Sequence, residues 1–543
     1  MTTAEYITSI VSKNVPCYNN PEEALSLPYA VFYVDEKPQY DKDGVYGYID
    51  TVDLYIAAAT FAELQKLKTA VVGSLGNAVK IQSIKDTSDD AAQWYSEISI
   101  ERRYRTEATQ EEDSGKEDIY SYGVIIPPPS NTTYKLTRTG NPLLHKSLPV
   151  QSQMRGCLLD DDGNVVKYLD ANDWTNEVRD GSQGQVMVEL PDRFYKTYTY
   201  ADGSYEMRIS TRPLTGYHYA PKMYAGAYEA SIQRSTSKLC SVVNTTTDYR
   251  GGGNQSAWDG TYRSQLGMPV TAISLTNFRE AARRRKANST EWNAYLYEAH
   301  KWLFWLFAIE YATLNVQDTY NAEPTSEGYR QGGLGSGVTA LTDAWGAYNN
   351  ASPFIPCGVT DSLGNGTGVV SYTINNNNES NPITRTLEVP RYRGIENPFG
   401  HISMLADGIN IHISLTVDNG GDGLSKVYVC DDPDKFSSTG YDGYTYIGNA
   451  PRKSGWIKNI IGGEHGDIIP TEVGGGSTQR FCDQYFTSIP SIEAILATAL
   501  LGGRADYGTY AGLVSTYTYR NASSSESQSS GTRLCFLPRN GAR

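Results

Sequence analysis

Cysteine and histidine are the first side chains to test for chemistry, because thiolates and imidazoles bind metals and act as nucleophiles or bases. The seven cysteines include no CxxC pair; they are Cys17, Cys157, Cys240, Cys357, Cys430, Cys482 and Cys535. The six histidines never fall at HxxxH or HExxH spacing; they are His145, His218, His300, His401, His412 and His465. The scattered cysteines argue against a disulfide scaffold and a zinc site, and the histidine spacing gives no support for zinc hydrolysis.

Three acidic residues in a row, Asp160, Asp161 and Asp162, precede Gly163. This run lacks the spaced ligands and distal glutamate of an EF-hand, so it predicts a tight Asp-Gly hairpin turn between two strands. The glycine-rich run at 332–337 is not followed by GK[ST], which argues against a phosphate loop. We therefore expect no bound metal and no cofactor. Paired carboxylates for glycosidase chemistry stay open, because their separation in space is not readable from sequence.

Tyrosine dominates the aromatic residues, with 41 Tyr against 12 Phe and 8 Trp. Its large contact area and small loss of side-chain entropy suit binding surfaces, although half-buried filler in a loop-rich β protein is the plainer interpretation of any one tyrosine. The stretch 503–531 combines tyrosines with Ser, Asn and Arg, as antibody paratopes do. The predicted ligand-binding residues are Tyr507, Tyr510, Tyr517, Tyr519, Arg520, Asn521 and Ser523.

Two consequences follow if this stretch forms a binding surface. Its side chains contribute little to the core, and the local fold depends on Gly502, Gly503 and a terminal strand at 532–537. The competing interpretation is a disordered polar loop, which the serine-rich run 523–530 alone would fit.

The net charge of −14 and a pI of about 5.1 argue against binding to nucleic acid or to an anionic membrane. One basic run, 283–286, lies on a predicted helix and is expected to be a solvated face. The N-terminus lacks the pattern of a signal peptide, and the most apolar stretch, 302–314, is broken by Glu310 and too short to span a bilayer. We expect a soluble protein made in a reducing cytoplasm.

Residues 1–105 form the first predicted unit. Helix-like residues open it, strands are predicted at 28–35, 48–59 and 96–104, and helical spacing is found at 61–75. This order indicates a small α+β domain. Residues 106–147 are acidic and then proline-rich at 127–129, which predicts a linker, or alternatively an ordered arm packed on the neighbouring domain.

From residue 148 to 543, Gly, Asn, Ser, Thr and Tyr rise and short strands alternate with glycine-rich turns. One long helix is predicted at 288–314. Its apolar residues cover almost the whole circumference and its start carries a capping Asn or Ser, so we expect it to be buried, with His300 as a satisfied core residue.

The first unit resembles the tail-terminator or tail-completion proteins of tailed phages. The resemblance is carried by PYAVFYVD, by TVDLYIAAATFAELQKLKTAVV, and by Trp94 ahead of the strand EISIERRY. It implies a domain that forms rings at a tail end or neck through sheet edges and a flanking helix. A generic α+β adaptor remains the alternative.

The second unit resembles the C-type-lectin fold in its formylglycine-generating-enzyme-like variant, which phage tropism determinants also use. The matching segments follow in order at 154–174, 184–195, 267–285, 291–317, 391–411, 474–486 and 499–538, with GTRLCFL as the last buried strand. Enzymes of that family need a pair of reactive cysteines that bind a metal. Cys535 lies within an apolar strand and Cys482 has no near partner in sequence, so we expect no oxidase activity.

The resulting fold expectation is α+β, a small tail-terminator-like domain followed by a large loop-rich lectin-like domain. The expected function is that of a bacteriophage virion structural protein, made in the host bacterial cytoplasm, which docks into tail or neck as a homo-oligomeric ring. It would display a receptor-binding domain for host attachment through a surface glycan or protein. The alternatives are a purely architectural ring or decoration protein and, third, an enzyme of the formylglycine type or a glycan hydrolase.

Overall fold

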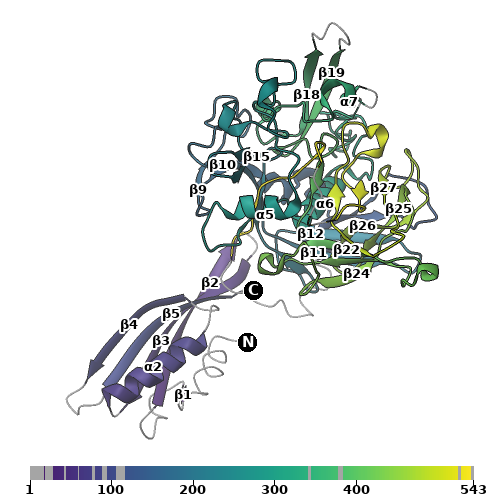
Figure 1. Cartoon of the computed structure of the whole chain (residues 1–543). Helices are drawn as coiled ribbons and strands as arrows, with labels where there is room; N and C mark the ends of the chain where they lie inside the picture. The colour runs from purple at the N-terminus through teal and green to yellow at the C-terminus, as the bar shows by residue number, and fades with distance from the viewer. Residues whose placement is uncertain are drawn as a thin grey trace. The chain divides into compact units, whose positions relative to one another are not determined.

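The computed structural model describes residues 17–18, 29–41, 44–58, 60–75, 80–88, 94–104, 117–339, 341, 344–376, 383–521, 523 and 527–539. The chain divides into two compact units, one formed by Met1–Glu112 with Arg539–Arg543 and the other by Asp113–Pro538 (Figure 1). Both combine helices with mostly antiparallel strands, which confirms the α+β class. Among the described residues, no helix has the length and apolarity needed to cross a membrane.

The smaller unit contains a five-stranded sheet of order β1-β2-β3-β5-β4, with one long helix, α2. The bounds are β1 Cys17–Tyr18, β2 Tyr29–Asp41, β3 Gly44–Ala58, α2 Phe61–Leu75, β4 Lys80–Ser88 and β5 Trp94–Tyr104. Leu64 and Val71 of α2 are fully buried, as are Leu54 on β3 and Ile98 on β5, so the helix and sheet share one core. The predicted helix and three predicted strands are confirmed, β4 was missed, and the expected opening helix lies outside the described residues.

The predicted boundary at residue 148 is wrong, because the larger unit begins well before it. Strand β6 (Tyr122–Ile126) is inserted between β12 (Tyr205–Ser210) and β7 (Thr137–Gly140). The proline run is also fixed in place: the buried guanidinium of Arg480 donates from Nη1 to the carbonyls of Pro127 (2.9 Å) and Pro128 (3.2 Å). Residues 117–147 therefore belong to the folded unit, as the ordered-arm alternative expected of the apolar VIIPPP segment.

Four larger sheets organise the second unit. The first has the order β13-β11-β12-β6-β7, where β13 is His218–Ala220 and β11 is Arg193–Thr199. The second is β17 (Trp292–Asn293), β32 (Cys535–Phe536), β14 (Met223–Gly226), β10 (Gln185–Leu190), β8 (Arg155–Leu159) and β9 (Val165–Tyr168). The third is β26 (Asp467–Val473), β25 (Gly455–Gly462), β27 (Gln484–Phe486), β30 (Thr516–Tyr517), β29 (Leu500–Leu501), β21 (Ser403–Leu405) and β31 (Ser530–Gly531). The fourth is β24 (Thr445–Asn449), β23 (Ser425–Val429), β22 (Ile409–Ile413) and β28 (Ile495–Ala497).

Smaller elements complete this unit. A hairpin pairs β15 (Ser231–Gln233) with β16 (Lys238–Cys240), and a three-stranded sheet joins β18 (Gly368–Asn376), β19 (Ile383–Tyr392) and β20 (Ile395–Glu396). The β18–β19 hairpin projects from the body of the unit (Figure 1). The helices are α3 Glu117–Tyr120, α4 Pro142–Ser147, α5 Leu275–Arg283, α6 Tyr297–Tyr311 and α7 Trp345–Asn349.

Helix α6 lies in the main core, which confirms the prediction of a buried helix. Trp302 and Trp305 are fully buried, and every residue of the helix except Glu298 is buried. The helix begins nine residues later than predicted, because Trp292 and Asn293 instead form β17 and pair with β32. His300 is a satisfied core residue, as expected: Nε2 lies 2.6 Å from the Leu513 carbonyl and Nδ1 lies 3.1 Å from the Tyr295 hydroxyl.

The basic run at 283–286 is not a solvated face. Arg285 is buried and pairs with Asp161 at 2.5 Å, and Arg283 donates to the Pro433 carbonyl at 2.6 Å. Within this run only Arg284 is exposed. Arg283 and Arg285 thus connect the C-terminal end of α5 to neighbouring loops, and the local sequence does not indicate these contacts.

The Asp-Gly turn is confirmed. Strands β8 and β9 form an antiparallel hairpin, and the Asp160 carboxylate accepts a hydrogen bond from the backbone N–H of Asn164 at 2.8 Å. Gly163 has φ +87°, and a Cβ there would lie 2.1 Å from the ring of Phe536 on β32. The turn thus packs closely against the last strand. The terminal segment is buried as predicted, because Leu534 and Cys535 are fully buried, but the strand is shorter than the predicted 532–537 and comprises only Cys535–Phe536.

Candidate functional site

Three neighbouring strands of the seven-stranded sheet, β25, β27 and β30, place aromatic side chains on one face. Trp456 on β25 lies opposite Gln484 on β27, and Phe486 on β27 lies opposite Tyr517 on β30. Because side chains alternate along a strand, these residues share a face. The other face carries Ile457, Tyr485 and Leu501, which are fully buried in the main core. The sheet therefore separates a core face from an aromatic face.

We define the aromatic face as Trp456, Phe486, Tyr507, Tyr510, Tyr517 and Tyr519. Phe486 lies in the middle, with ring centroids 4.7 Å from Tyr507, 6.2 Å from Tyr510 and 6.3 Å from Tyr517. Trp456 contacts Tyr510 at 5.1 Å and Tyr517 contacts Tyr519 at 5.7 Å. In Figure 1, β25 and β27 lie beside the yellow C-terminal segments that supply the tyrosines.

Exposure divides these six rings into two groups. Tyr510 is 41% exposed and Tyr519 is 44% exposed, so both offer ring surface to solvent. The others are half-buried; Tyr507 packs against the main core and Tyr517 against a second core cluster. Burial raises the pKa of Tyr507 to about 12 and also raises the pKa of Tyr517. The expectation that this stretch contributes little to the core is thus wrong for these two tyrosines.

The loop that carries Tyr507 and Tyr510 is held by close backbone packing. Gly503 has φ +71°, and a Cβ there would lie 2.9 Å from the Cα of Ala511. Gly512 passes so close to Asp483 that a Cβ would lie 2.0 Å from its carboxylate, which accepts a hydrogen bond from the Val514 N–H at 2.8 Å. A loop fixed in this way presents its tyrosines with little conformational entropy left to lose on binding.

Two arginines flank the aromatic face. Arg504 donates from Nε to Asp506 at 2.7 Å and from Nη1 to Ser529 at 3.1 Å, and its guanidinium lies 5.0 Å from the Tyr507 ring. Arg520 is half-buried beside Tyr517, and its carbonyl accepts from the Thr498 N–H at 3.2 Å. Aromatic rings between such cations can stack on sugar rings or apolar groups, while the guanidiniums donate to hydroxyls or carboxylates.

The remaining two predicted residues, Asn521 and Ser523, form hydrogen bonds with each other. The Asn521 side-chain oxygen accepts from the Ser523 N–H at 2.9 Å and from its hydroxyl at 2.7 Å, which closes a turn, although both residues are exposed. Ser529 and Ser530 are buried, and Ser530 begins β31, so a disordered polar loop is the wrong interpretation for this end of the serine run. Residues 522 and 524–526 lie outside the described residues.

The cysteines that an oxidase would need are not in a reactive setting. The six cysteines whose side chains the structure describes are free thiols, and both Cys482 and Cys535 are buried. Burial raises the pKa of each of these two thiols to about 12, which keeps them protonated at neutral pH. Across the described part of the chain, no group of three or more His, Cys, Asp or Glu side chains is placed to hold a metal ion.

No protein-family model and no curated protein matches this chain.

Sequence reasoning found four of the six rings of the aromatic face and missed Trp456 and Phe486. Both lie outside the tyrosine-rich stretch, on strands that reach β30 only through sheet pairing. Their local signal is alternation: Trp456 precedes the buried Ile457, and Phe486 follows the buried Tyr485. An aromatic residue on the solvent side of a predicted strand is the feature that would have identified them.

Proposed function

We propose that this protein is a structural component of a phage virion which docks through its smaller unit and binds a host surface glycan or protein through its larger unit. The observation that carries the proposal is the aromatic face. Two of its tyrosines are more than 40% exposed, while Tyr507 and Tyr517 pack against the core and Phe486 contacts both of them. Rigid aromatic area with flanking arginines is the composition of binding hot spots.

The lectin-like part of the proposal is supported by the order and kind of elements in the larger unit. The segments that resemble the family contain strands β8 to β11, then helices α5 and α6, then β20 to β22, β27 and the terminal strands. The last strand, β32, pairs with β14, and β14 pairs with β10 in the sheet that also holds β8. The first and last strands of the family-like region thus lie in one sheet and give a fixed base for display loops.

The docking part of the proposal is supported by the sheet of the smaller unit. Strand β4 lies at one end of the described sheet, where it pairs with β5 alone. A nine-residue edge strand offers backbone donors and acceptors to another chain, which is one way to build a ring of copies.

Two measurements test this function. Mass spectrometry of purified virions from the phage that encodes the chain is expected to find the protein as a particle component. The labelled full-length protein is expected to bind cells of the phage's host and not cells of a phage-resistant strain. A protein absent from the particles contradicts the docking role. A protein found in particles that binds no host cells leaves the architectural alternative in place of receptor binding.

A further inference from the structure

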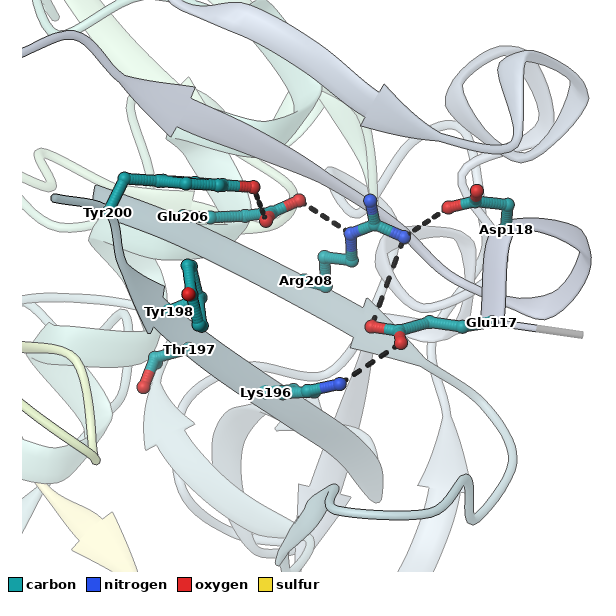
Figure 2. Close-up of a pocket in the computed structure, with 8 residues that line it drawn as sticks. All are labelled: Glu117, Asp118, Lys196, Thr197, Tyr198, Tyr200, Glu206 and Arg208. Carbon is teal, nitrogen blue, oxygen red and sulfur yellow. Dashed lines mark hydrogen bonds and ion pairs between the residues drawn. The ribbon is translucent and has the colours of Figure 1, made fainter. Parts of the chain in front are cut away.

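A polar pocket of about 390 Å³ opens on the first sheet of the larger unit, on different strands from the aromatic face (Figure 2). Strand β11 contributes Lys196 and Tyr198, and β12 contributes Glu206 and Arg208. Thr197 of β11, two residues of α3 (Glu117 and Asp118) and Tyr200 of the β11–β12 connection complete the lining. Its volume falls within the range of small-molecule sites, and charged groups and tyrosines make up its lining.

Arg208 organises one side of the pocket. Its Nε donates to Glu206 at 2.5 Å and its Nη1 donates to Asp118 (Figure 2). Its Nη2 donates to the Thr139 hydroxyl at 2.7 Å. Opposite, the ammonium of Lys196 donates to Glu117 at 3.0 Å. These contacts hold the charged groups in position before any ligand arrives, so binding costs little side-chain entropy.

Two tyrosines form the other side. The Tyr200 hydroxyl donates to Glu206 at 2.6 Å, and that bond, followed by burial, raises the pKa of Tyr200 to about 12. The Tyr198 ring meets the Tyr200 ring edge to face, with centroids 4.6 Å apart. Tyr198 is 55% exposed, so an aromatic surface stands open beside a fixed array of donors and acceptors (Figure 2).

The charges in the pocket restrict the ligand. Three carboxylates, Glu117, Asp118 and Glu206, face two cations, Lys196 and Arg208, which leaves one net negative charge. An anionic ligand would meet repulsion, because both cations already have carboxylate partners. An apolar ligand would strip water from charged groups without replacing their hydrogen bonds.

From this arrangement we infer that the pocket is a binding site for an uncharged saccharide of one or two rings. Each sugar hydroxyl both donates and accepts, so it can bond to a carboxylate and to an ammonium or guanidinium at once. The apolar C–H face of a sugar ring can cover Tyr198. This site uses none of the residues of the aromatic face, and the inference does not rest on the proposed function.

Titration calorimetry of the full-length protein with three neutral disaccharides, maltose, lactose and chitobiose, tests the inference. At least one is expected to bind, and Tyr198→Ala is expected to weaken that sugar about tenfold or more because the stacking ring is lost. Tyr446→Ala is the matched control: Tyr446 is similarly exposed but lies on β24, in another sheet, and its removal is expected to leave the affinity unchanged.

A second variant separates sugar binding from cation binding. Asp118→Asn removes a charge but keeps an oxygen that accepts from Arg208, so the sugar affinity is expected to change by less than about threefold. Binding by none of the three sugars overturns the inference, as does equal binding by the parent and Tyr198→Ala. Binding of putrescine that is abolished by Asp118→Asn, with no sugar bound, also overturns it and marks a cation site. Replacing Tyr510 or Tyr519, neither of which lines the pocket, is expected to leave these titrations unchanged, so a failure of the proposed receptor site is seen separately.

Discussion

Phe486 and Tyr517 lie opposite each other on two parallel strands, with ring centroids 6.3 Å apart, although they are 31 residues apart in sequence. The next residue back along each strand, Tyr485 and Thr516, is buried on the core side. The sheet therefore has the core of the larger unit on one face, and this aromatic pair lies on the opposite, solvent-facing side.

Gly503 is expected to be essential to the shape of that surface. Gly503→Ala places a side chain at φ +71° and forces a Cβ to within 2.9 Å of the Ala511 Cα, so the free energy of unfolding should fall by about 1–3 kcal/mol or more. Gly463→Ala is the control, because that glycine has a similar φ of +64° but nothing within 4 Å of its Cβ position. Urea unfolding measures both. Equal losses would mean that the contact with Ala511 contributes nothing.

Among the six cysteines whose side chains the structure describes, Cys430 is expected to react fastest with a thiol label, because it alone of the six is not classed as buried. In a Cys17→Ser background, adding Cys430→Ser should remove the fast labelling of the native protein. Cys482 and Cys535 should react only after denaturation, since burial raises their pKa values to about 12. Fast labelling of both in the native protein would revive the oxidase hypothesis.

The stability of the larger unit is expected to fall in acid partly through His300. Burial lowers its pKa from 6.5 to about 4, so between these pH values the unfolded chain binds a proton that the folded chain does not. Stability from this group is therefore complete above pH 6.5 and is lost as the pH falls towards 4, by at most about 3 kcal/mol.

His300→Gln removes this titration while keeping a donor for the Leu513 carbonyl. Urea unfolding at pH 6.5 and pH 4 should show a smaller loss for the variant than for the parent. The same loss in both proteins would show that His300 is already protonated in the folded state.

The position of the boundary between the units predicts how truncated chains behave. A chain that begins at residue 113 keeps β6 and β7, whereas one that begins at 148 loses them and with them the buried Tyr122 and Val124. The shorter chain should melt well below the longer one or be insoluble, because β12 loses one of its two partner strands and the core loses two buried side chains. Melting curves by circular dichroism that coincide would contradict the assignment of this segment to the core.

Local pattern was enough to predict some elements and not others. The helical spacing of apolar residues predicted α2, and the apolar run around the whole circumference predicted α6. The same patterns indicated which side chains of each helix are buried. Strand β4, KIQSIKDTS, was missed because its polar residues hide the alternation. The proline run at 127–129 resembled a linker because its anchor, Arg480, lies 353 residues from Pro127 and cannot be identified locally.

The aromatic face was half predicted for the same reason. Composition identified its tyrosines, which are close in sequence. Trp456 and Phe486 join them only through pairing between distant strands, and a single sequence carries no record of that pairing. The same pairing determines that Tyr507 and Tyr517 are partly core residues rather than free ligand-binding groups.

Binding to host cells by a Tyr510→Ala, Tyr519→Ala double variant tests the proposed receptor site most directly. Both rings are largely exposed, so the melting temperature should stay close to that of the parent, since surface changes usually alter stability by less than about 0.5 kcal/mol each. Cell binding by the labelled full-length protein should fall about tenfold or more, while Tyr446→Ala should bind like the parent. A folded double variant that binds host cells as well as the parent would contradict the claim that the aromatic face is the receptor site.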